Sequence, residues 1–363
     1  MRVTSPACVR LERRGPLAVA TLDRPAALNA LDLGMIRALA VAAADWARDP
    51  KVRAVVLKGA GARAFCAGGD IRGVCAARDG ADAAATRDFF AEEYRLNRAI
   101  HRFPKPWVSL MDGITMGGGV GLSIHGSHRV ATEGTRWAMP ETGIGFFPDV
   151  GGGWFLPRLP GALGRYLALT GASLEAADVL SAGIATHFVP SRRLEPLEGE
   201  LARALGAREG DPGETVSRVL DAHGADPGPS PLEPLRPAID ACFGAASLEA
   251  ILAALEARNT PWARETLESL AAKSPTSLRV TWRLLDEGRS RSLEEDLIVE
   301  YRLSQRFVAS HDLCEGVRAA LVDRDRRPRW DPPSLAGVTD DAVAAFFAPL
   351  GDLELRFEET SLP

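Results

Sequence analysis

Residues 105–158 read KPWVSLMDGITMGGGVGLSIHGSHRVATEGTRWAMPETGIGFFPDVGGGWFLPR. This stretch opens with an apolar run at Trp107–Met111, which has the length and composition of a buried strand. Three glycines follow at 117–119, and the apolar residues Val120–Ile124 after them predict the first turns of a helix. A strand, a glycine turn and a helix N-terminus leave backbone N–H groups exposed, and such groups suit an anion or a developing oxyanion.

Two carboxylates come soon after these glycines, Glu141 in AMPET and Asp149 in FPDVGGG. Both stand among glycines and prolines, which are typical of loops. Backbone donors followed by two loop carboxylates outline an active site, and we predict one here. The alternative for Glu141 is a carboxylate that caps a turn and takes no part in chemistry.

The overall composition excludes some classes of partner. The chain has 363 residues, enough to bury a large core as one long domain or as two. Its formal net charge is −5, whereas nucleic-acid-binding domains carry a basic surface, so we expect no nucleic-acid partner. No apolar run reaches the roughly 18 residues that a membrane-spanning helix needs, so we also expect no membrane partner.

The cysteines bear on the redox compartment and on metal binding. They are scattered and form no C-x-x-C pair, which argues against a disulfide framework and a zinc site. The histidines likewise lack metal-ligand spacing, and no metal or prosthetic group is expected. The N-terminal MRVTSPACVRLERRG contains no apolar segment of signal-peptide length. An arginine-rich transit peptide is conceivable, but Glu12 and the strand-like LAVATL directly afterwards leave little room for one. From these features we expect a cytoplasmic protein.

Strand-like and helix-like segments alternate along the first half of the chain. Apolar runs predict strands at 17–22, 52–57, 107–111, 128–132 and 185–189. Helices are predicted between them, one of them at 87–103. Such alternation predicts an α/β layer structure with crossover connections. Beyond residue 157 the chain becomes helical, with an irregular surface excursion predicted at 209–237 and amphipathic helices at 247–322.

The motif GAGARA at 59–64 matches the G-x-G-x-x-A fingerprint of dinucleotide-binding folds. That fold needs a helix directly after the motif, whereas this chain continues as the glycine-rich AFCAGGD. We therefore interpret the segment as a second loop of close backbone approach, in which Gly68 and Gly69 supply N–H groups.

A glutamate pair, Glu92 and Glu93, lies in a predicted helix beside aromatic residues. Two helical glutamates usually form a solvated face, but one of two consecutive positions must lie nearer the apolar stripe. Glu93 is thus a candidate for a contact in the site, and the residues alone leave both interpretations open.

These segments together resemble the enoyl-CoA hydratase/isomerase (crotonase) superfamily. The motifs shared at that level are LDRPAALNAL at 22–31, AFCAGGDI at 64–71 and GGG at 117–119. Further motifs resemble its hydrolases of short 3-hydroxyacyl-CoA thioesters, and they are EEYRLN at 92–97, GITMGGGVGLSIHG at 113–126, AMPETGIGFFPDVGGGWFLPRL at 138–159, EYRLSQ at 300–305 and HDLCEGVRAALVDRDRRPRW at 311–330. The resemblance covers almost the whole chain and is weakest at 191–261.

The resemblance implies an α/β fold with a crotonase-like ββα spiral core and a helical C-terminal region. Residues 1–200 would form the core with an acyl-CoA site, and residues 201–363 a mainly helical region and tail. Such C-terminal helices either fold back on their own subunit or cross to a neighbour in a trimer. A homo-oligomer is therefore an open expectation.

The resemblance also assigns roles to residues. It places the two oxyanion-binding N–H groups on Gly69 and Gly118 and makes Glu141 the catalytic carboxylate. Asp149 is its second site carboxylate, which assists proton transfer or holds the acyl group, and Glu93 matches a position that contacts the substrate's 3-hydroxyl. The substrate contacts implied are thus Glu93, Gly118, Glu141 and Asp149.

A departure from the family pattern narrows the expected reaction. The superfamily's hydratases use two glutamates, and the first falls where this chain has Gly121. Adding water across a double bond needs a carboxylate on each side of the water, whereas thioester hydrolysis needs one carboxylate and an oxyanion hole. We therefore expect hydrolysis, and the resemblance implies as substrate a short 3-hydroxyacyl-CoA, foremost 3-hydroxyisobutyryl-CoA from valine breakdown. CoA would be part of the substrate, and no separate cofactor is implied.

Several alternatives stay open. The chain could be an enoyl-CoA hydratase or isomerase, or an acyl-CoA-binding relative without catalysis. 3-Hydroxypropionyl-CoA is not separated from 3-hydroxyisobutyryl-CoA, because one methyl group gives only about 1–3 kcal/mol of discrimination. The sequence also does not choose between an acyl-enzyme anhydride on Glu141 and general-base catalysis by it.

Overall fold

The structure of the protein is a computed structural model in which residues 8–77, 83–207 and 210–357 are described. The chain divides into two compact units, each assembled from three segments. The first unit comprises Met1–Asp70, Leu96–Ala138 and Ser173–Pro234, and the second Ile71–Arg95, Met139–Ala172 and Leu235–Pro363. The predicted division at residue 200 separates regions by secondary-structure content and does not coincide with these units, so it stays a prediction.

The first unit holds the strands. They are β1 (Val9–Arg14), β2 (Leu17–Leu22), β3 (Ala54–Gly59), β4 (Ala64–Cys66), β5 (Trp107–Met111), β6 (Ile114–Met116), β7 (His128–Ala131), β8 (Arg136–Ala138) and β9 (His187–Phe188). Its helices are α1 (Leu33–Arg48), α4 (Gly118–Ile124), α7 (Ala176–Ser181), α8 (Leu194–Gly206) and α9 (Pro212–His223).

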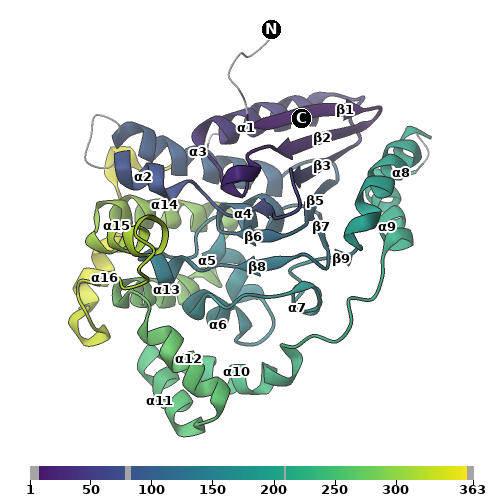
Figure 1. The fold of residues 1–363 in the computed structure, drawn as a ribbon. Helices are drawn as coiled ribbons and strands as arrows, with labels where there is room; N and C mark the ends of the chain where they lie inside the picture. Colours follow the sequence, from purple (N-terminus) through teal and green to yellow (C-terminus); the bar gives the residue numbers. More distant parts are fainter. Residues whose placement is uncertain (1–7, 78–82, 208–209, 358–363) are drawn as a thin grey trace. The chain divides into compact units, whose positions relative to one another are not determined.

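The strands form two sheets that repeat one pattern. The larger sheet has the order β1-β2-β3-β5-β7-β9 and the smaller the order β4-β6-β8 (Figure 1). Strands β1 and β2 pair antiparallel, and the other neighbouring strands of both sheets pair parallel. Along the chain β3 leads to β4, β5 to β6 and β7 to β8, so each turn contributes one strand to each sheet. This repeat confirms the predicted α/β spiral core.

The strands β2, β3 and β5 of the larger sheet are largely buried, whereas β1 is exposed beyond Val9, and α8 packs on this sheet. Its core includes Val19, Val56 and Val130, which pack with Leu197 and Leu201 of α8. Spacings of four residues along α8 place its leucines on one helical face, as expected for an amphipathic helix on a sheet. Burial of this apolar surface is the main stabilising contribution to the unit.

The predicted irregular excursion at 209–237 is wrong in its central part. Glu209 lies outside the described residues, but Pro212–His223 forms α9. Asp211 caps this helix by accepting a hydrogen bond from the Glu214 N–H at 3.0 Å. Proline is favoured in the first turn of a helix, so Pro212 marks a helix start where the composition favoured a loop.

The second unit is built from helices. They are α2 (Ile71–Ala77), the first part of α3 (Ala83–His101), α5 (Gly152–Phe155), α6 (Leu163–Thr170), α10 (Arg236–Phe243), α11 (Leu248–Arg258), α12 (Pro261–Ala271), α13 (Pro275–Gly288), α14 (Leu293–Ala309), α15 (His311–Val317) and α16 (Asp340–Phe347). Shorter turns are η2 (Glu141–Ile144), η3 (Leu156–Arg158) and a π-helical turn at Arg318–Val322. The expected helical C-terminal region is therefore confirmed.

The starts of these helices follow from capping side chains. Ser247, Thr260, Ser274 and Ser292 each accept a hydrogen bond from a backbone N–H in the first turn of α11, α12, α13 and α14. Such a cap satisfies a donor that has no partner within the helix. Within the described parts of the chain, no helix combines the length and apolarity that a membrane crossing requires.

Candidate active site

Two glycine loops of the first unit lie against each other. Gly68 and Gly117 have φ of +114° and +49°, a region that favours glycine over residues with a side chain. A Cβ atom built on Gly68 would lie 3.5 Å from the Met116 carbonyl oxygen and 3.8 Å from the Gly118 nitrogen. The loop after β4 and the loop after β6 therefore present their backbones side by side, as the two predicted donor loops require.

The N–H of Gly69 points away from its strand neighbour. Gly69 forms an isolated parallel bridge with Leu31. Leu31 donates to the Gly68 carbonyl at 2.8 Å and accepts from the Asp70 N–H at 2.8 Å. Because a parallel bridge uses the groups that flank its central residue, the N–H of Gly69 itself is left for another acceptor.

The N–H of Gly118 lies in the first turn of α4, where no earlier turn supplies a carbonyl for it. The next residue fixes its place: a Cβ on Gly119 would lie 2.2 Å from the Cys66 carbonyl oxygen. Only glycine allows α4 to approach β4 so closely. The two predicted oxyanion donors thus both belong to the first unit, where their loops are neighbours.

Glu141 opens the buried turn η2 in the second unit. Tight backbone contacts fix this turn, because a Cβ on Gly145 would lie 2.2 Å from the Asp312 carbonyl oxygen and one on Gly316 would lie 2.3 Å from Ile144. Asp312 and Gly316 both lie in α15, so the turn and α15 pack backbone to backbone. The turn is therefore held without involving the Glu141 carboxylate.

The Glu141 carboxylate is buried and incompletely hydrogen-bonded. Its Oε2 atom has no hydrogen-bond partner among the described residues. Burial, and second the charge of Asp149, raise the pKa of Glu141 well above its ordinary value. A buried carboxylate with an unpaired oxygen is suited to attack an electrophile or take a proton from water. A turn cap without chemistry would have both oxygens satisfied.

Asp149 stands at the end of the following loop and contacts α3. The Tyr94 hydroxyl donates a hydrogen bond to Asp149 Oδ2 at 2.8 Å. Burial raises the pKa of Asp149 to about 7, while this hydrogen bond acts in the opposite direction. Near neutral pH the group is therefore able to give or take a proton.

Glu93 is buried on α3, whereas its neighbour Glu92 is only half-buried. Its Oε1 atom has no hydrogen-bond partner among the described residues. Burial and the charge of Asp149 raise the pKa of Glu93 well above its ordinary value. The solvated-face interpretation is thus wrong for Glu93, and its contact with substrate stays a prediction.

Aromatic packing joins the elements that carry these carboxylates. Phe90 of α3 stacks on Phe146 at 5.7 Å between ring centroids, and Phe146 meets Phe307 of α14 at 5.6 Å. Phe146 lies between Glu141 and Asp149 in sequence, so its packing anchors the segment that bears both acids. Aromatic pairs of this kind contribute roughly 0.5–1.5 kcal/mol beyond their buried area.

The sequence analysis missed two residues of this cluster. The sequence places Tyr94 on an apolar helix face without indicating a partner for its hydroxyl, and it offers Glu300 only as part of the motif EYRLSQ. Glu300 is fully buried on α14, where it follows Leu297 along the apolar stripe. An acidic residue within an apolar stripe was the signal that could have identified it.

The predicted site residues thus fall into two groups. Gly69 and Gly118 belong to the first unit, and Glu93, Glu141 and Asp149 to the second. Within each unit the predicted members are neighbours. Across residues 8–77, 83–207 and 210–357, no group of three or more potential ligand side chains is arranged to hold a metal ion.

Comparisons with known proteins agree with the resemblance. The profile of the enoyl-CoA hydratase/isomerase family matches residues 17–347. A curated protein of Xenopus tropicalis named mitochondrial 3-hydroxyisobutyryl-CoA hydrolase is 50% identical over 95% of this chain and 90% of its own length.

Solved structures are similar over nearly their full length. One described as a carnitinyl-CoA dehydratase from Mycobacterium thermoresistibile is 45% identical with a TM-score of 0.88, covering 97% of this chain and 99% of its own. Another, described as an enoyl-CoA hydratase from Rhodobacter sphaeroides, is 41% identical with a TM-score of 0.87, covering 97% and 100%.

The expected cytoplasmic location is wrong, because the curated relatives are named as mitochondrial proteins. The expectation rested on scattered cysteines and on the N-terminal composition. Cysteines that form no disulfide indicate reducing surroundings, but they do not distinguish one reducing compartment from another.

Proposed function

Because this chain belongs to the enoyl-CoA hydratase/isomerase family, we propose that it hydrolyses 3-hydroxyisobutyryl-CoA to 3-hydroxyisobutyrate and CoA. The support is 50% identity, over 95% of the chain, to a curated protein named for that reaction. The motifs in the sequence independently favour the same reaction, in valine breakdown.

The observation that carries the proposal is that the chain has one of the two catalytic glutamates of the hydratases and lacks the other. Glu141 is buried with an unpaired oxygen, whereas the position of the hydratases' other glutamate is Gly121 on α4. Glycine has no side chain to give or take a proton. Hydrolysis of a thioester needs a single carboxylate, so the residues present favour it over hydration.

In the proposed reaction the thioester oxygen accepts hydrogen bonds from the N–H groups of Gly69 and Gly118. Negative charge grows on that oxygen when the carbonyl carbon is attacked. Each such donor contributes on the order of 10²–10³ in rate in other enzymes. The pair therefore stabilises the transition state more than the ground state.

Glu141 supplies the attack by one of two routes. As a general base it takes a proton from water, the hydroxide adds to the carbonyl carbon, and the C–S bond breaks to release the CoA thiolate. As a nucleophile it attacks the carbon itself, the C–S bond breaks to release the CoA thiolate, and water then hydrolyses the resulting anhydride to free the acid and Glu141. In both routes of the proposal Asp149, whose pKa is about 7, moves a proton to the leaving thiolate or from water.

Glu93 supplies selectivity in this proposal by accepting a hydrogen bond from the substrate's 3-hydroxyl. CoA enters as part of the substrate, and the proposal includes no separate cofactor. Assembly into a homo-oligomer stays a prediction.

The test is an assay with two substrates. Free thiol released from 3-hydroxyisobutyryl-CoA is measured beside the absorbance of crotonyl-CoA. We expect thiol release without loss of the enoyl absorbance. Loss of that absorbance without thiol release would establish instead the second candidate, an enoyl-CoA hydratase, which the description of the Rhodobacter sphaeroides structure favours. Tight binding of CoA esters with neither product would establish a non-catalytic relative.

A further inference from the structure

A carboxylate on α14 holds the loop that carries Asp149. Glu300 accepts one hydrogen bond from the Gly151 N–H at 2.8 Å on Oε2 and another from the Gly153 N–H at 3.0 Å on Oε1. Both glycines follow Asp149 within four residues, and Glu300 is fully buried. The steps of the proposed reaction give this residue no role.

The loop needs such support because its backbone is strained. Val150 has a φ of +54° and the next residue, Gly151, a φ of +89°. A β-branched residue in the left-handed region is an outlier, and such strain costs of order 1–3 kcal/mol. It persists only where surrounding contacts hold it, and the two bonds to Glu300 lie directly after the strained residue.

The loop also lies against α13 and α14 with no room for a side chain. A Cβ on Gly153 would lie 2.6 Å from Asp296 Oδ1 and 2.7 Å from Leu284 Cδ1. Asp296 stands one helical turn before Glu300, so both acids face the loop from α14. The backbone after Asp149 is thereby fixed against two helices.

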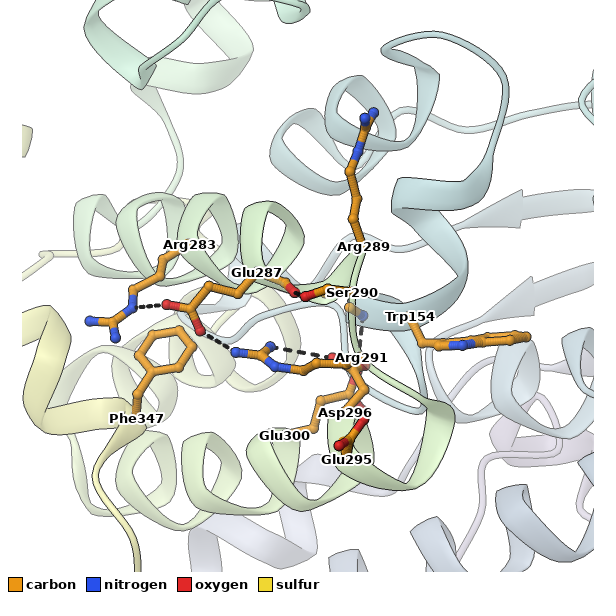
Figure 2. A network of polar contacts seen from close by, with 12 residues as sticks. Trp154, Arg283, Glu287, Arg289, Ser290, Arg291, Glu295, Asp296, Glu300 and Phe347 are labelled. Atoms are coloured by element: carbon orange, nitrogen blue, oxygen red, sulfur yellow. Dashed lines mark hydrogen bonds and ion pairs between the residues drawn. The ribbon is translucent and has the colours of Figure 1, made fainter.

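A chain of charges links these buried acids to the surface. Figure 2 shows Arg291 between Glu287 and Asp296, and its Nη1 atom lies 3.5 Å from Asp296 Oδ1. Arg283 donates to Glu287 at 2.6 Å at the outer end of the chain. The positive charge of Arg291 offsets part of the cost of burying two carboxyl groups side by side.

We propose that Glu300 is a positioning residue: by binding the N–H groups of Gly151 and Gly153 it holds the turn at Val150, and thereby keeps Asp149 aligned with the Tyr94 hydroxyl for proton transfer. This inference rests on the proposed function, because the proton transfer belongs to that reaction. Glu300 acts through the loop and does not touch the substrate.

The electrostatics around Glu300 agree with close coupling to Asp149. Burial raises the pKa of Glu300 well above its ordinary value, and the carboxylates of Asp296 and then Asp149 raise it further. The titratable and charged groups around it are Asp296 on its own helix, Asp149 in the loop, Tyr94 on α3 and, beyond Asp296, Arg291 and Arg158.

The test is Glu300→Gln in the full-length protein. The amide oxygen can accept from one loop N–H, but the amide NH₂ then meets the other, so one of the two bonds is lost. We expect the kcat of thiol release to fall about 100-fold, as for a misplaced catalytic group. KM should change by less than about threefold, because no substrate contact is removed.

A second readout separates positioning from a merely structural role. The pKa of Asp149 is followed by the ¹³C resonance of its side-chain carboxyl in wild type and variant, with Asp149→Asn identifying the signal. Misalignment weakens the Tyr94 hydrogen bond, which lowers this pKa, so Glu300→Asp, which keeps a carboxyl group beside Asp149, should raise it. In a Tyr94→Phe background the same change should add little, because the bond is already absent.

The control is Glu295→Gln on the same helix. Glu295 is exposed and closes the capping box of α14 with Ser292, a role that glutamine also fills. The Glu295→Gln variant should retain the kcat and the Asp149 pKa of the wild type. Glu300→Asp keeps the carboxyl group but withdraws it by one methylene, so it loosens both loop bonds without removing the acid beside Asp149, and its kcat also replaces that of Glu300→Gln if the latter does not fold.

An unchanged Asp149 pKa in Glu300→Asp, or an unchanged kcat in the folded Glu300 variants, would overturn the inference. Because the resonance is measured without turnover, it is informative even if the wild type releases no thiol. In that case the proposed function fails, and a raised Asp149 pKa in Glu300→Asp still supports positioning.

Discussion

The Tyr94 hydroxyl donates a hydrogen bond to Asp149 Oδ2 at 2.8 Å, and both side chains are buried. The bond joins α3 to the loop that follows η2. Burial disfavours the charged form of Asp149, whereas a donor at its oxygen favours it, and the resulting pKa is about 7. The tyrosine therefore keeps a buried carboxyl group within reach of neutral pH, where it can exchange protons.

Tyr94→Phe should raise the pKa of Asp149. The ring is kept, so the packing changes little, and only the donor is lost. A hydrogen bond to a charged group contributes about 1.5–3 kcal/mol, which corresponds to a rise of roughly one to two pKa units. The ¹³C titration of Asp149 measures this, with Tyr166→Phe as the control because Tyr166 packs on Phe243 and Trp262 instead. A pKa that does not move would show that the bond has no such effect.

Asp149→Asn should change the pH dependence of stability. An acid whose pKa is raised by folding binds its proton more tightly in the native state, so the wild type loses stability as pH rises from about 4 to about 7. Asparagine carries no charge and still offers Tyr94 an acceptor. The variant should be more stable than wild type at pH 8, by up to about 4 kcal/mol, and should gain nothing at pH 4.

Urea unfolding at the two pH values measures the free energy of unfolding for this comparison. Equal differences between variant and wild type at pH 4 and pH 8 would contradict the raised pKa. The variant should also lose most of its thiol-releasing activity at every pH, because it cannot transfer a proton.

Glu93→Gln should weaken recognition of the substrate's hydroxyl group. Glutamine keeps one oxygen that can accept from that hydroxyl but replaces the other with an NH₂ donor, so kcat/KM for 3-hydroxyisobutyryl-CoA should fall by roughly 10-fold. Isobutyryl-CoA lacks the hydroxyl, so its kcat/KM should change far less. Glu92→Gln, at the half-buried neighbouring position, is the matched control. An equal loss for both substrates would show that Glu93 does not read the hydroxyl.

Gly119→Ala should displace the donor at Gly118. The added Cβ would lie 2.2 Å from the Cys66 carbonyl oxygen, a backbone atom that cannot move aside on its own. Overpacking of this kind costs typically about 1–3 kcal/mol, and a displaced oxyanion donor lowers kcat by about 10²–10³. Thermal unfolding and thiol release together measure the two effects.

Gly199→Ala is the control for that variant. Gly199 lies in α8 of the same unit, and a Cβ added there would meet no neighbouring side chain or loop within 4 Å. Alanine should stabilise this helix by about 0.5–1 kcal/mol and leave kcat unchanged. Wild-type kcat in Gly119→Ala would contradict the assignment of a donor to Gly118.

Much of the fold was predictable because local signals agreed with the tertiary arrangement. The apolar runs at 17–22 and 107–111 form strands with the predicted bounds. Every residue of both strands is buried, so a continuous apolar run was a sufficient signal for them. The donor loops were predictable because close backbone approach leaves only glycine possible, as at Gly119. At Gly117, the positive φ is a second reason for glycine in the same loop.

Other features depend on contacts that no local pattern contains. Glu300 looks like one more charged residue of an amphipathic helix until the fold places Gly151 and Gly153 against it. The hydroxyl of Tyr94 could be assigned to Asp149 only once α3 was placed beside the loop. The acids of the site were predictable from their residue type and from the family resemblance. Their hydrogen-bond partners were not, because those contacts join residues far apart in the sequence.

The most direct test of the account is Glu141→Gln, assayed for free thiol from 3-hydroxyisobutyryl-CoA and for binding of the same ester by calorimetry. Glutamine is neutral and of similar shape, so the buried position should tolerate it and the fold should persist. It can neither attack the thioester nor take a proton, so turnover should fall by about 10²–10⁴ while the Kd stays near that of wild type. Wild-type turnover in this variant, or loss of binding with unchanged turnover per bound ester, would contradict the role of Glu141.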